Sequence, residues 1–363
     1  MKNTFGNAIT VTIFGESHGP YIGAVVDGIA PGIKIDKDYI ESALKKRRPS
    51  DGISTARIEA DEFQIISGEF DGFTTGTPLC VIIPNTAAKS CDYSELKTKP
   101  RPSHADFAAE CKYHGFQDYR GGGHFSGRVT AALVCVGAIL SSLLLEKGIK
   151  IGTHIKSLGG ICDREITDGD LDILRTLPFP VLDGNAALKM RERIEAVKKE
   201  GDSIGGVLES VVTGIPSGVG EPWFDSVESV LSHILFSVPA VKGVEFGAGF
   251  GFADMCGSDA NDAFYTDGEN VYTKTNNNGG INGGITNGMP IVFRTAIKPT
   301  PSIYKEQSTV NLDTMENTTL KINGRHDPAI IHRAAAVIDA VTAIAVADLL
   351  CVRYGTDYLL KKN

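Results

Sequence analysis

The spacing of apolar residues divides the chain into short strands and longer helices. A period of two residues is typical of half-buried strands, whereas apolar residues three and four positions apart predict a helix with one buried face. Strands are expected at 9–14, 21–29, 78–83, 205–215 and 290–297, with two more within 57–70. Helices are expected at 37–48, 131–147, 185–200, 225–236 and 328–350. This mixture predicts an α+β fold.

Two of the helical segments, 131–147 and 328–350, are apolar on nearly every side, which predicts helices buried in the core. The apolar run between Arg128 and Glu146 has about 15 residues, fewer than the roughly 20 that a membrane span needs. The N-terminus has none of the features of a signal peptide. We therefore expect a cytoplasmic protein with no membrane partner.

The segment 243–289 is rich in Gly and Asn and shows no periodicity. Unstructured connections of this length are usually functional or disordered. Residues 276–284 carry few bulky side chains, so their backbone could lie flat against a planar ligand or form a flexible surface loop. We expect a long loop here, and we consider it a candidate lid.

The order of these elements repeats along the chain. Residues 22–32 resemble 204–218, and residues 72–79 resemble 284–291. The apolar residues after Arg128 match those after Arg333 in their spacing. We therefore predict one compact domain over 1–363, built from two quasi-equivalent halves at about 1–149 and 203–355 with a connector at 150–202. Superposition of the two halves tests this prediction.

Composition and charge limit the classes of function. The 363 residues are 42% hydrophobic and 22% charged, as is ordinary for a soluble globular protein. A net charge of −8 argues against general binding to nucleic acid. The seven cysteines are scattered and form no CxxC pair. We expect them to be reduced and mostly buried, with no metal site.

One segment, 99–130, concentrates ionisable side chains around three consecutive glycines. It contains His104, His124, Ser126 and Arg128, and an apolar helix follows at once. A glycine-rich loop at a helix start can offer backbone N–H groups and the positive end of the helix dipole to an anion such as phosphate. Histidines add proton transfer near neutral pH. A solvated glycine turn is the alternative, but the density of charged groups favours a site.

Two further polar groups lie at the ends of predicted elements. Ser17 and His18 follow a strand and are flanked by glycine, where His18 is either part of a site or a hydrogen-bonded turn residue. Arg47 and Arg48 end a predicted helix. There they either complement the helix dipole or bind a multiply charged anion.

The last polar group surrounds Asp327. With Pro328 after it, Asp327 has the sequence of a helix N-cap, which does not explain Arg325 and His326 beside it. Several well-known motifs are absent from the sequence: GxxxxGK[ST], GxGxxG between a strand and a helix, GxSxG and HExxH. P-loop, Rossmann and common hydrolase chemistry are therefore disfavoured.

Nine short motifs, taken in order, resemble those of the chorismate synthase family. They are GESHG at 15–19, RRP at 47–49, RPSHAD at 101–106, YRGGGHFSGR at 119–128, GDSIG at 201–205, KGVEFG at 242–247, GGINGG at 279–284, KPT at 298–300 and GRHDP at 324–328. The resemblance implies a β-α-β sandwich subunit and a homotetramer. It also implies a lyase that eliminates phosphate from 5-enolpyruvylshikimate 3-phosphate to give chorismate, the last step of the shikimate pathway, with reduced FMN and no net redox change.

The same resemblance assigns roles to residues. His18, backed by Ser17, is expected near the leaving phosphate, His104 near the N1/O2 edge of the flavin, and Asp327 near flavin N5. Arg47, Arg48 and Arg128 are expected to bind the phosphate of the substrate or of NADP. The expected FMN contacts are His124, Phe125, Ser126, Pro239, Ala240, Gly283, Lys298, Pro299, Thr300, Pro301, Ser302 and Arg325. NADPH is a candidate reductant of the flavin, and no metal is implied.

The chain departs from the common family pattern in two places. Many members have an arginine and a hydroxyl residue where this chain has His124 and Phe125, so contacts to the flavin phosphate or ring edge can differ there. Ile53 stands where the family often has a second arginine, and Arg57 is a candidate replacement.

Other functions fit some of the same residues. A phosphate-handling kinase, a flavin reductase or another anion-binding flavoprotein would also need arginines, and so would a non-enzymatic scaffold. Histidines in three of the polar groups argue against a simple binder, because binding needs charge and not proton transfer. Chorismate formation from substrate and reduced FMN, without ATP or a hydride donor, discriminates among these functions.

Overall fold

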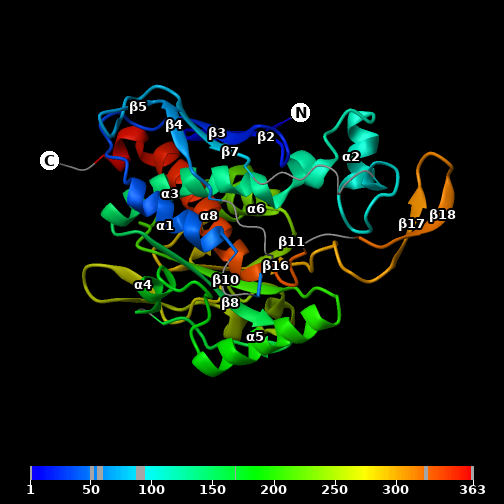
Figure 1. Ribbon diagram of the computed structural model, residues 1–363. Helices are drawn as coiled ribbons and strands as arrows, with labels where there is room; N and C mark the ends of the chain where they lie inside the picture. The colour runs from blue at the N-terminus through cyan, green and yellow to red at the C-terminus, as the bar shows by residue number, and fades with distance from the viewer. Residues whose placement is uncertain are drawn as a thin grey trace.

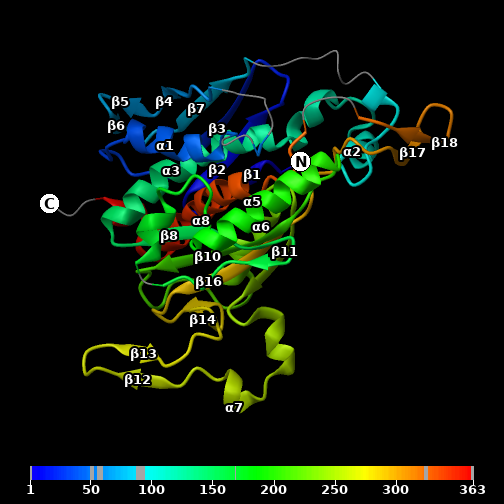
Figure 2. The same ribbon diagram turned by 60° about the horizontal axis from the view of Figure 1, so that its bottom comes forward.

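Two antiparallel five-stranded sheets enclose a layer of helices (Figure 1). This computed structural model describes residues 2–49, 53–54, 60–86, 95–167, 169–322 and 326–360. One sheet lies on each side of the helices, so the chain forms β, α and β layers in that order (Figures 1 and 2). The α+β sandwich expected from the sequence is confirmed.

The first sheet comes from the N-terminal part of the chain, in the order β1-β2-β3-β7-β4. On β3, Ile22, Ala24 and Val26 are buried, as the period of two residues requires for a face that packs on the helices. The strands are β1 (Thr4–Phe5), β2 (Thr10–Gly15), β3 (Tyr21–Asp27), β4 (Gln64–Ser67) and β7 (Leu79–Pro84).

The second sheet has the order β11-β16-β10-β8-β9. Its strands are β8 (Lys150–Leu158), β9 (Ile161–Cys162), β10 (Gly206–Thr213), β11 (Val241–Phe246) and β16 (Ile291–Ile297). The main strands of the two sheets share one spatial order, since β2-β3-β7-β4 and β8-β10-β16-β11 both place the first, second, fourth and third strands side by side. This order supports the two quasi-equivalent halves, which stay a prediction until the halves are superposed.

The expected connector at 150–202 is wrong at its N-terminal end. Residues 150–158 form β8, which pairs with β10 from Lys150 to Leu158 and is therefore part of the second sheet. A β-bulge between Val207 and Leu208 interrupts the register of this pair. Most residues of β8 are buried, so the strand lacks the alternation by which the other strands were recognised.

Four helices form the central layer: α1 (Lys37–Arg47), α3 (Thr130–Glu146), α6 (Val227–Ser237) and α8 (Ile331–Tyr354). α1 begins where the sequence predicts, because the Asp36 side chain accepts a hydrogen bond from Tyr39 N at 2.9 Å. α3 and α8 pack closely, and a Cβ atom on Gly137 would lie 2.4 Å from Ala340 O. The helical segment Gly127–Glu146, which contains α3, and the helix α8 are apolar and long enough to cross a membrane, so the expectation that the first is too short is wrong. Because 78% and 83% of their apolar windows are buried inside the protein, both serve as core helices.

Smaller elements surround the sandwich. Leu171 and Leu174 of α4 pack with Val211 of β10, and α5 contacts β9 at the sheet edge. α2 lies beside the β17–β18 hairpin at one end of the molecule (Figure 1). The bounds are α2 (Asp106–Tyr113), α4 (Asp170–Leu174), α5 (Gly184–Lys199), β5 (Glu69–Phe70), β6 (Phe73–Thr74), β17 (Gln307–Asn311) and β18 (Glu316–Leu320).

The expectation of one long loop at 243–289 is wrong. The segment begins within β11 and continues through η5 (Gly249–Asp254), α7 (Gly257–Ala260), β12 (Phe264–Thr266), β13 (Val271–Thr273), β14 (Ile281–Asn282) and β15 (Ile285–Thr286). α7 and the β12–β13 hairpin project from the body (Figure 2). The Asp262 carboxylate organises the Asn-rich part, because it accepts from Asn277 N at 2.7 Å and Asn278 N at 2.8 Å. Hydrogen bonds of this kind leave no hydrophobic period in the sequence.

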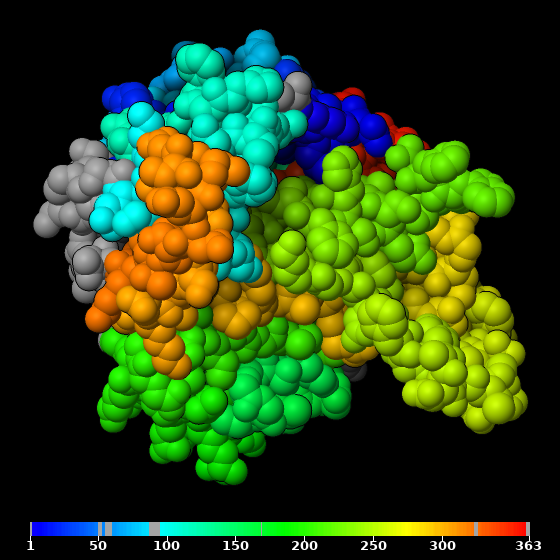
Figure 3. All heavy atoms as spheres, turned by 90° about the vertical axis from the view of Figure 1, so that its right-hand side faces the viewer, coloured from blue at the N-terminus to red at the C-terminus, as the bar shows by residue number. Residues whose placement is uncertain are grey.

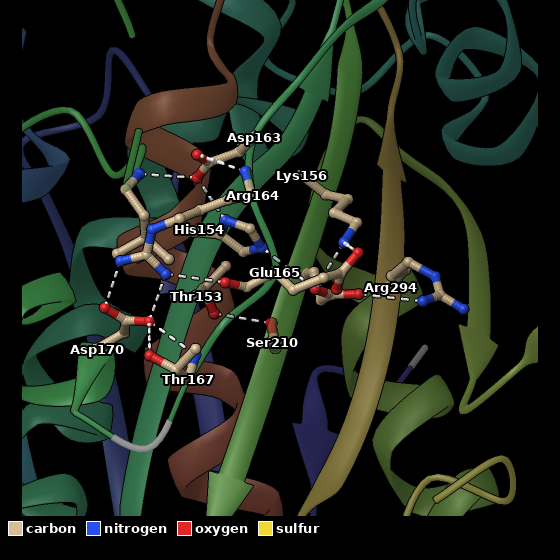
Figure 4. A network of polar contacts seen from close by, with 12 residues as sticks. Thr153, His154, Lys156, Asp163, Arg164, Glu165, Thr167, Asp170, Ser210 and Arg294 are labelled. Carbon is tan, nitrogen blue, oxygen red and sulfur yellow. Dashed lines mark hydrogen bonds and ion pairs between the residues drawn. The ribbon is translucent and has the colours of Figure 1, made fainter. Parts of the chain in front are cut away.

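A row of charged side chains crosses the second sheet (Figure 4). Glu209 of β10 lies between His154 of β8 and Arg294 of β16, with Nε2 of His154 at 3.3 Å and an Arg294 nitrogen at 3.0 Å. Nδ1 of His154 lies 2.7 Å from Asp163. Burial would raise the pKa of Glu209, but the hydrogen bond from His154 and the charge of Lys156 outweigh it and lower the pKa to about 2. Opposite charges on neighbouring strands stabilise the pairing.

The expectation that the cysteines are mostly buried is wrong for the six described ones. All six are free thiols, but only Cys135 and Cys351, on the central helices, are buried. Burial raises the pKa of each of these two thiols to about 12. Cys111, Cys162 and Cys256 are exposed because α2, β9 and the segment before α7 lie outside the helical layer.

Candidate active site

A cavity of about 760 Å³ opens at one end of the helical layer. Its walls come from the C-terminal ends of α1 and α6, the N-terminal ends of α3 and α8, and the loop after β16. Figure 3 views the side of the molecule on which the β17–β18 hairpin and the α2 region lie beside the α6–β11 region. The lining of the cavity includes two acidic residues, Asp61 and Asp327, and six basic ones, Arg47, Arg48, Arg128, Lys242, Lys298 and Arg333. This excess of positive charge suits an anionic ligand.

Gly121, Gly122 and Gly123 form a turn within η2 (Arg120–Phe125), which is followed by η3 (Gly127–Val129) and then α3. All three have positive φ angles, at 58°, 84° and 52°. A Cβ atom on Gly123 would lie 2.0 Å from Asp118 O, and one on Gly121 would lie 2.2 Å from Cε1 of His18. Only glycine fits both requirements, so the run of three glycines allows the backbone to pass tightly over His18.

Ser17 and His18 lie behind this turn. Ser17 N donates to Gly123 O at 3.0 Å, and the two residues are only 0% and 8% exposed. Oγ of Ser17 is buried and has no hydrogen-bond partner among the described residues. Among the described residues, Gly121 lines the cavity and His18 does not, so the predicted catalytic His18 lies behind the lining, against Gly121.

His104 lines the cavity, and Asp106 fixes its orientation. Nδ1 of His104 lies 2.5 Å from Oδ1 of Asp106, and Arg101 donates to both Asp106 oxygens at 2.8 Å. Burial would raise the pKa of Asp106, but hydrogen bonds from Arg101 and His104 outweigh it and hold that pKa well below its ordinary value. The ionised carboxylate occupies the Nδ1 edge of the ring, and Nε2 lies toward Gly122.

Arg47, Arg48 and Arg128 converge on Asp61. Arg47 donates to Oδ2 of Asp61 at 2.9 Å, Arg128 donates to Oδ1, and Nε of Arg48 lies 3.7 Å from Oδ2. Burial would raise the pKa of Asp61, but the charges of Arg47 and Arg128 outweigh it and lower the pKa. The three predicted anion-binding arginines therefore share one wall and one fixed counter-ion.

Asp327 lines the cavity but does not cap α8. The helix begins at Ile331, and its N-cap residue, Ile330, makes no side-chain capping bond. Instead, Oδ2 of Asp327 accepts from Arg333 at 2.6 Å, and Nε of Arg333 donates to Arg47 O at 2.8 Å. Arg333 therefore joins Asp327 to the end of α1, beside the arginine cluster.

The cavity brings together most of the predicted flavin contacts. Those that line it are His124, Phe125, Ser126, Pro239, Ala240, Lys298, Thr300 and Pro301. Pro299 and Ser302 flank this set: Pro299 packs against Gly205, and Ser302 accepts from Arg101 at 3.3 Å. Burial, followed by the charge of Lys242, lowers the pKa of Lys298.

The remaining predicted contacts are not brought together by this chain. Gly283 lies in the turn between β14 and β15, and no residue of 243–289, a range that is described throughout, lines the cavity. The fold therefore places neither Gly283 nor the expected lid at the site. Ile53 is buried in the hydrophobic core, so it offers no anion contact. Arg325 and Arg57 lie outside the described residues.

Sequence reasoning missed the roles of three residues that hold the site together: Asp61, Asp106 and Arg333. Asp106 stands two residues after His104, and carboxylates beside histidines often orient them, so a local signal existed. The repeat that matches Arg128 with Arg333 was a signal for the latter. Nothing in the sequence around Asp61 indicates that it meets two arginines from other elements.

Comparisons with known proteins identify the family of the chain. Residues 9–351 match the family model described as chorismate synthase. The chain is 45% identical over 348 residues to a chorismate synthase of Pyrococcus abyssi, covering 96% of this chain and 97% of that one. It is also 45% identical over 355 residues to one of Aeropyrum pernix, covering 97% and 93%.

A crystal structure of chorismate synthase has the same fold, with a TM-score of 0.72 at 29% identity, covering 96% of this chain and 94% of that chain. Chorismate synthases are carbon–oxygen lyases, and this chain is one of these lyases. The match over nearly its whole length and the identity of its relatives show that the chain belongs to the chorismate synthase family.

Proposed function

We propose that this chain converts 5-enolpyruvylshikimate 3-phosphate to chorismate with reduced FMN bound, the last step of the shikimate pathway. In this 1,4-anti-elimination, a C–O bond to phosphate and a ring C–H bond break, one C=C bond forms, and no net oxidation occurs. The main support is the shared cavity: His104, Asp327 and the arginine cluster line one space although they are far apart in sequence.

The residues of the cavity suit an anionic flavin together with a substrate that carries two carboxylates and a phosphate. Six basic side chains outnumber two acidic ones in the lining, and behind the glycine turn Ser17 Oγ is a buried hydroxyl without a partner among the described residues. His124, Ser126, Lys298 and Thr300 would hold the flavin by polar contacts. When bound, reduced FMN supplies transient electron density to the reacting ring.

We assign the departing phosphate to His18 and the arginine cluster. His18, which lies against Gly121 of the lining, donates a proton to the leaving group. Arg47, Arg48 and Arg128 hold the anionic groups by bidentate contacts and stabilise the charge that develops as the C–O bond breaks. The guanidinium groups of Arg47 and Arg128 are already fixed by Asp61, so little reorganisation of these two accompanies the reaction.

We assign the other proton transfers to His104 and Asp327. Asp106 occupies the Nδ1 edge of His104, so only Nε2 can exchange a proton with the cavity. The Asp327 carboxylate, held by Arg333, assists the removal of the ring proton.

Anaerobic turnover tests this function directly. The purified chain, photoreduced FMN and 5-enolpyruvylshikimate 3-phosphate are expected to give the absorbance of chorismate without ATP or a hydride donor. His104→Ala and Asp327→Ala are expected to lower kcat on the order of 100-fold. His114→Asn is the matched control, since His114 is exposed, lies outside the cavity, and has a left-handed conformation that Asn tolerates. Full turnover by both alanine variants would show that these roles are wrong.

A second assay addresses the reductant and the alternative activity. NADPH and oxidised FMN are supplied without light or dithionite. Chorismate formation under these conditions would show that the chain reduces its own flavin. NADPH oxidation without chorismate, even when reduced FMN is supplied separately, would instead favour a flavin reductase.

We further propose that the active form is a cytoplasmic homotetramer. Trp223, Phe224 and Phe250 are 84%, 91% and 84% exposed in the single chain, and large exposed apolar side chains are typical of subunit contacts. Sedimentation velocity is expected to give the mass of four chains, and a monomer at micromolar concentration would contradict the proposal.

A further inference from the structure

A second cavity, of about 390 Å³, lies among α1, α3, α4 and α8. It shares no lining residue with the candidate active site. Its volume falls within the range of roughly 300–1,000 Å³ that is typical of small-molecule sites. The proposed elimination makes no use of it.

The walls of this cavity are mostly small and apolar. Gly137 and Ala138 come from α3, Ala336 and Ala340 from α8, and Ile151 from β8. The small side chains of Ala138 and Ala336 leave room that larger side chains would fill, whereas Gly137 allows α3 to pack directly on Ala340 of α8. This surface fits an unbranched aliphatic group.

Charged groups of both signs face the same space. Lys46 of α1 and Arg175, next to α4, are its basic lining residues, and Asp339 of α8 and Asp172 of α4 are its acidic ones. Burial lowers the pKa of Lys46 and raises the pKa of Asp339, and the charge of each group opposes the shift of the other, so the two groups interact across the cavity.

Among the described residues, Lys46 and Asp339 make no direct ion pair with each other. Nζ of Lys46 donates to Leu174 O at 3.2 Å, which leaves two of its three N–H donors for a ligand. The Asp339 carboxyl interacts with the Thr153 hydroxyl, but its Oδ1 is buried without a hydrogen-bond partner among these residues. Buried polar groups are normally satisfied, so a cation and a carboxyl with unused capacity indicate a missing ligand.

We propose that this cavity binds a small zwitterion with an apolar side chain, such as an aliphatic α-amino acid. The ligand carboxylate pairs with Lys46 and Arg175, its ammonium group pairs with Asp339, and its side chain lies on Gly137, Ala138 and Ala340. The binding site does not depend on the proposed function, because it shares no residue with the active-site cavity.

Three probes of equal chain length test the ligand class: norleucine carries both charges, hexanoate only the carboxylate, and hexylamine only the ammonium group. Saturation-transfer NMR and calorimetric titration of the full chain are expected to show binding in the order norleucine, hexanoate, hexylamine. Norleucine should bind about tenfold more tightly than hexanoate, since it adds a charge-assisted contact. Hexanoate binding as tightly as norleucine would overturn the assignment of the ammonium group to Asp339.

Two near-isosteric variants locate the site. Lys46→Met and Asp339→Asn are each expected to weaken norleucine binding about tenfold. Lys45→Met is the matched control, because Lys45 neighbours Lys46 on α1, is exposed and does not line the cavity. This variant should bind norleucine as the wild-type chain does. Circular dichroism and Tm establish that the variants are folded. Lys46 is adjacent in sequence to Arg47 of the candidate active site, whereas Asp339 is not, so the Asp339 variant tests the second cavity without changing a neighbour of Arg47. Absence of binding by the wild-type chain to all three probes, or unchanged binding in both folded variants, would overturn the proposal.

Discussion

Two carboxylates, one buried and one partly buried, hold the charged side chains of the candidate active site in position. Asp106 accepts hydrogen bonds from Arg101 and occupies the Nδ1 edge of His104, and Asp61 accepts from Arg47 and Arg128. Positioning matters because a small displacement of a catalytic group costs rate. At the scale of single residues, these carboxylates therefore set the geometry without needing to touch a ligand.

Replacing Asp106 by Asn tests the positioning of His104. An amide can present its N–H₂ group to Nδ1 and reverse the hydrogen bond, so the ring loses its fixed tautomer. We expect kcat to fall on the order of tenfold with KM nearly unchanged, and the acidic limb of the pH–rate profile to shift. Glu110→Gln on the same helix is the control. Equal losses in the two variants would point to a general effect on α2 instead.

Removing the carboxylate at position 61 is expected to destabilise the fold. Asp61→Ala leaves Arg47 and Arg128 buried without their counter-ion, which costs about 3 kcal/mol of unfolding free energy. Glu62→Ala, at an exposed neighbour, should change the unfolding free energy by less than about 0.5 kcal/mol. Urea denaturation measures both values, and equal stability of the two variants would contradict this role.

At the scale of elements, the glycine turn before α3 is the most constrained segment of the site. Gly123→Ala places a Cβ atom 2.0 Å from Asp118 O at a φ of 52°, so we expect a loss of at least about 2 kcal/mol. Gly127→Ala, four residues later, has no atom within 4 Å of the new Cβ and should be nearly neutral. Thermal unfolding compares the two, and a stable Gly123→Ala variant would mean that the turn can relax.

The charged row across the second sheet links strand pairing to pH. The folded pKa of Glu209, about 2, lies below its unfolded value, so its stabilisation is present above roughly pH 4 and is lost as the pH falls through the folded value. Glu209→Gln is expected to cost about 2 kcal/mol at pH 7, and the deficit should narrow toward pH 2. Glu192→Gln, at an exposed position of α5, should show no pH-dependent deficit. A deficit in Glu209→Gln that is constant from pH 7 to 2 would exclude this linkage.

At the scale of the whole molecule, one hydrophobic cluster joins both sheets and the central helices. Asp348 of α8 adds a polar link, since its Oδ1 accepts from Asn7 N at 3.0 Å, Ala8 N at 2.7 Å and Ile9 N at 2.9 Å, just before β2. The end of the chain therefore holds its beginning in place.

Asp348→Ala leaves these three backbone donors without an acceptor, so we expect a loss of roughly 3 kcal/mol in one cooperative transition. Asp348→Asn keeps one acceptor oxygen and should recover part of that loss. Guanidinium denaturation followed by two spectroscopic probes measures the unfolding free energy of each variant and the number of unfolding transitions. Separate transitions for the two sheets in wild-type protein would contradict a single core.

The sequence by itself determined the elements with a clear period and the residues carried by local motifs. Amphipathic strands, the Asp36 cap and the apolar helices α3 and α8 appear in the order of residues, because local sterics and one buried face decide them. The same local information located His104 and Arg128.

Only the tertiary structure decided which distant groups meet. β8 has no readable alternation because most of it is buried, and the Asn-rich hairpins are held by Asp262 rather than by apolar contacts. The convergence of Asp61 with Arg47 and Arg128, and the joining of Asp327 to α1 by Arg333, depend on packing between layers. Such pairings join residues far apart in the chain, and hydrophobic periodicity carries no information about partners across that separation.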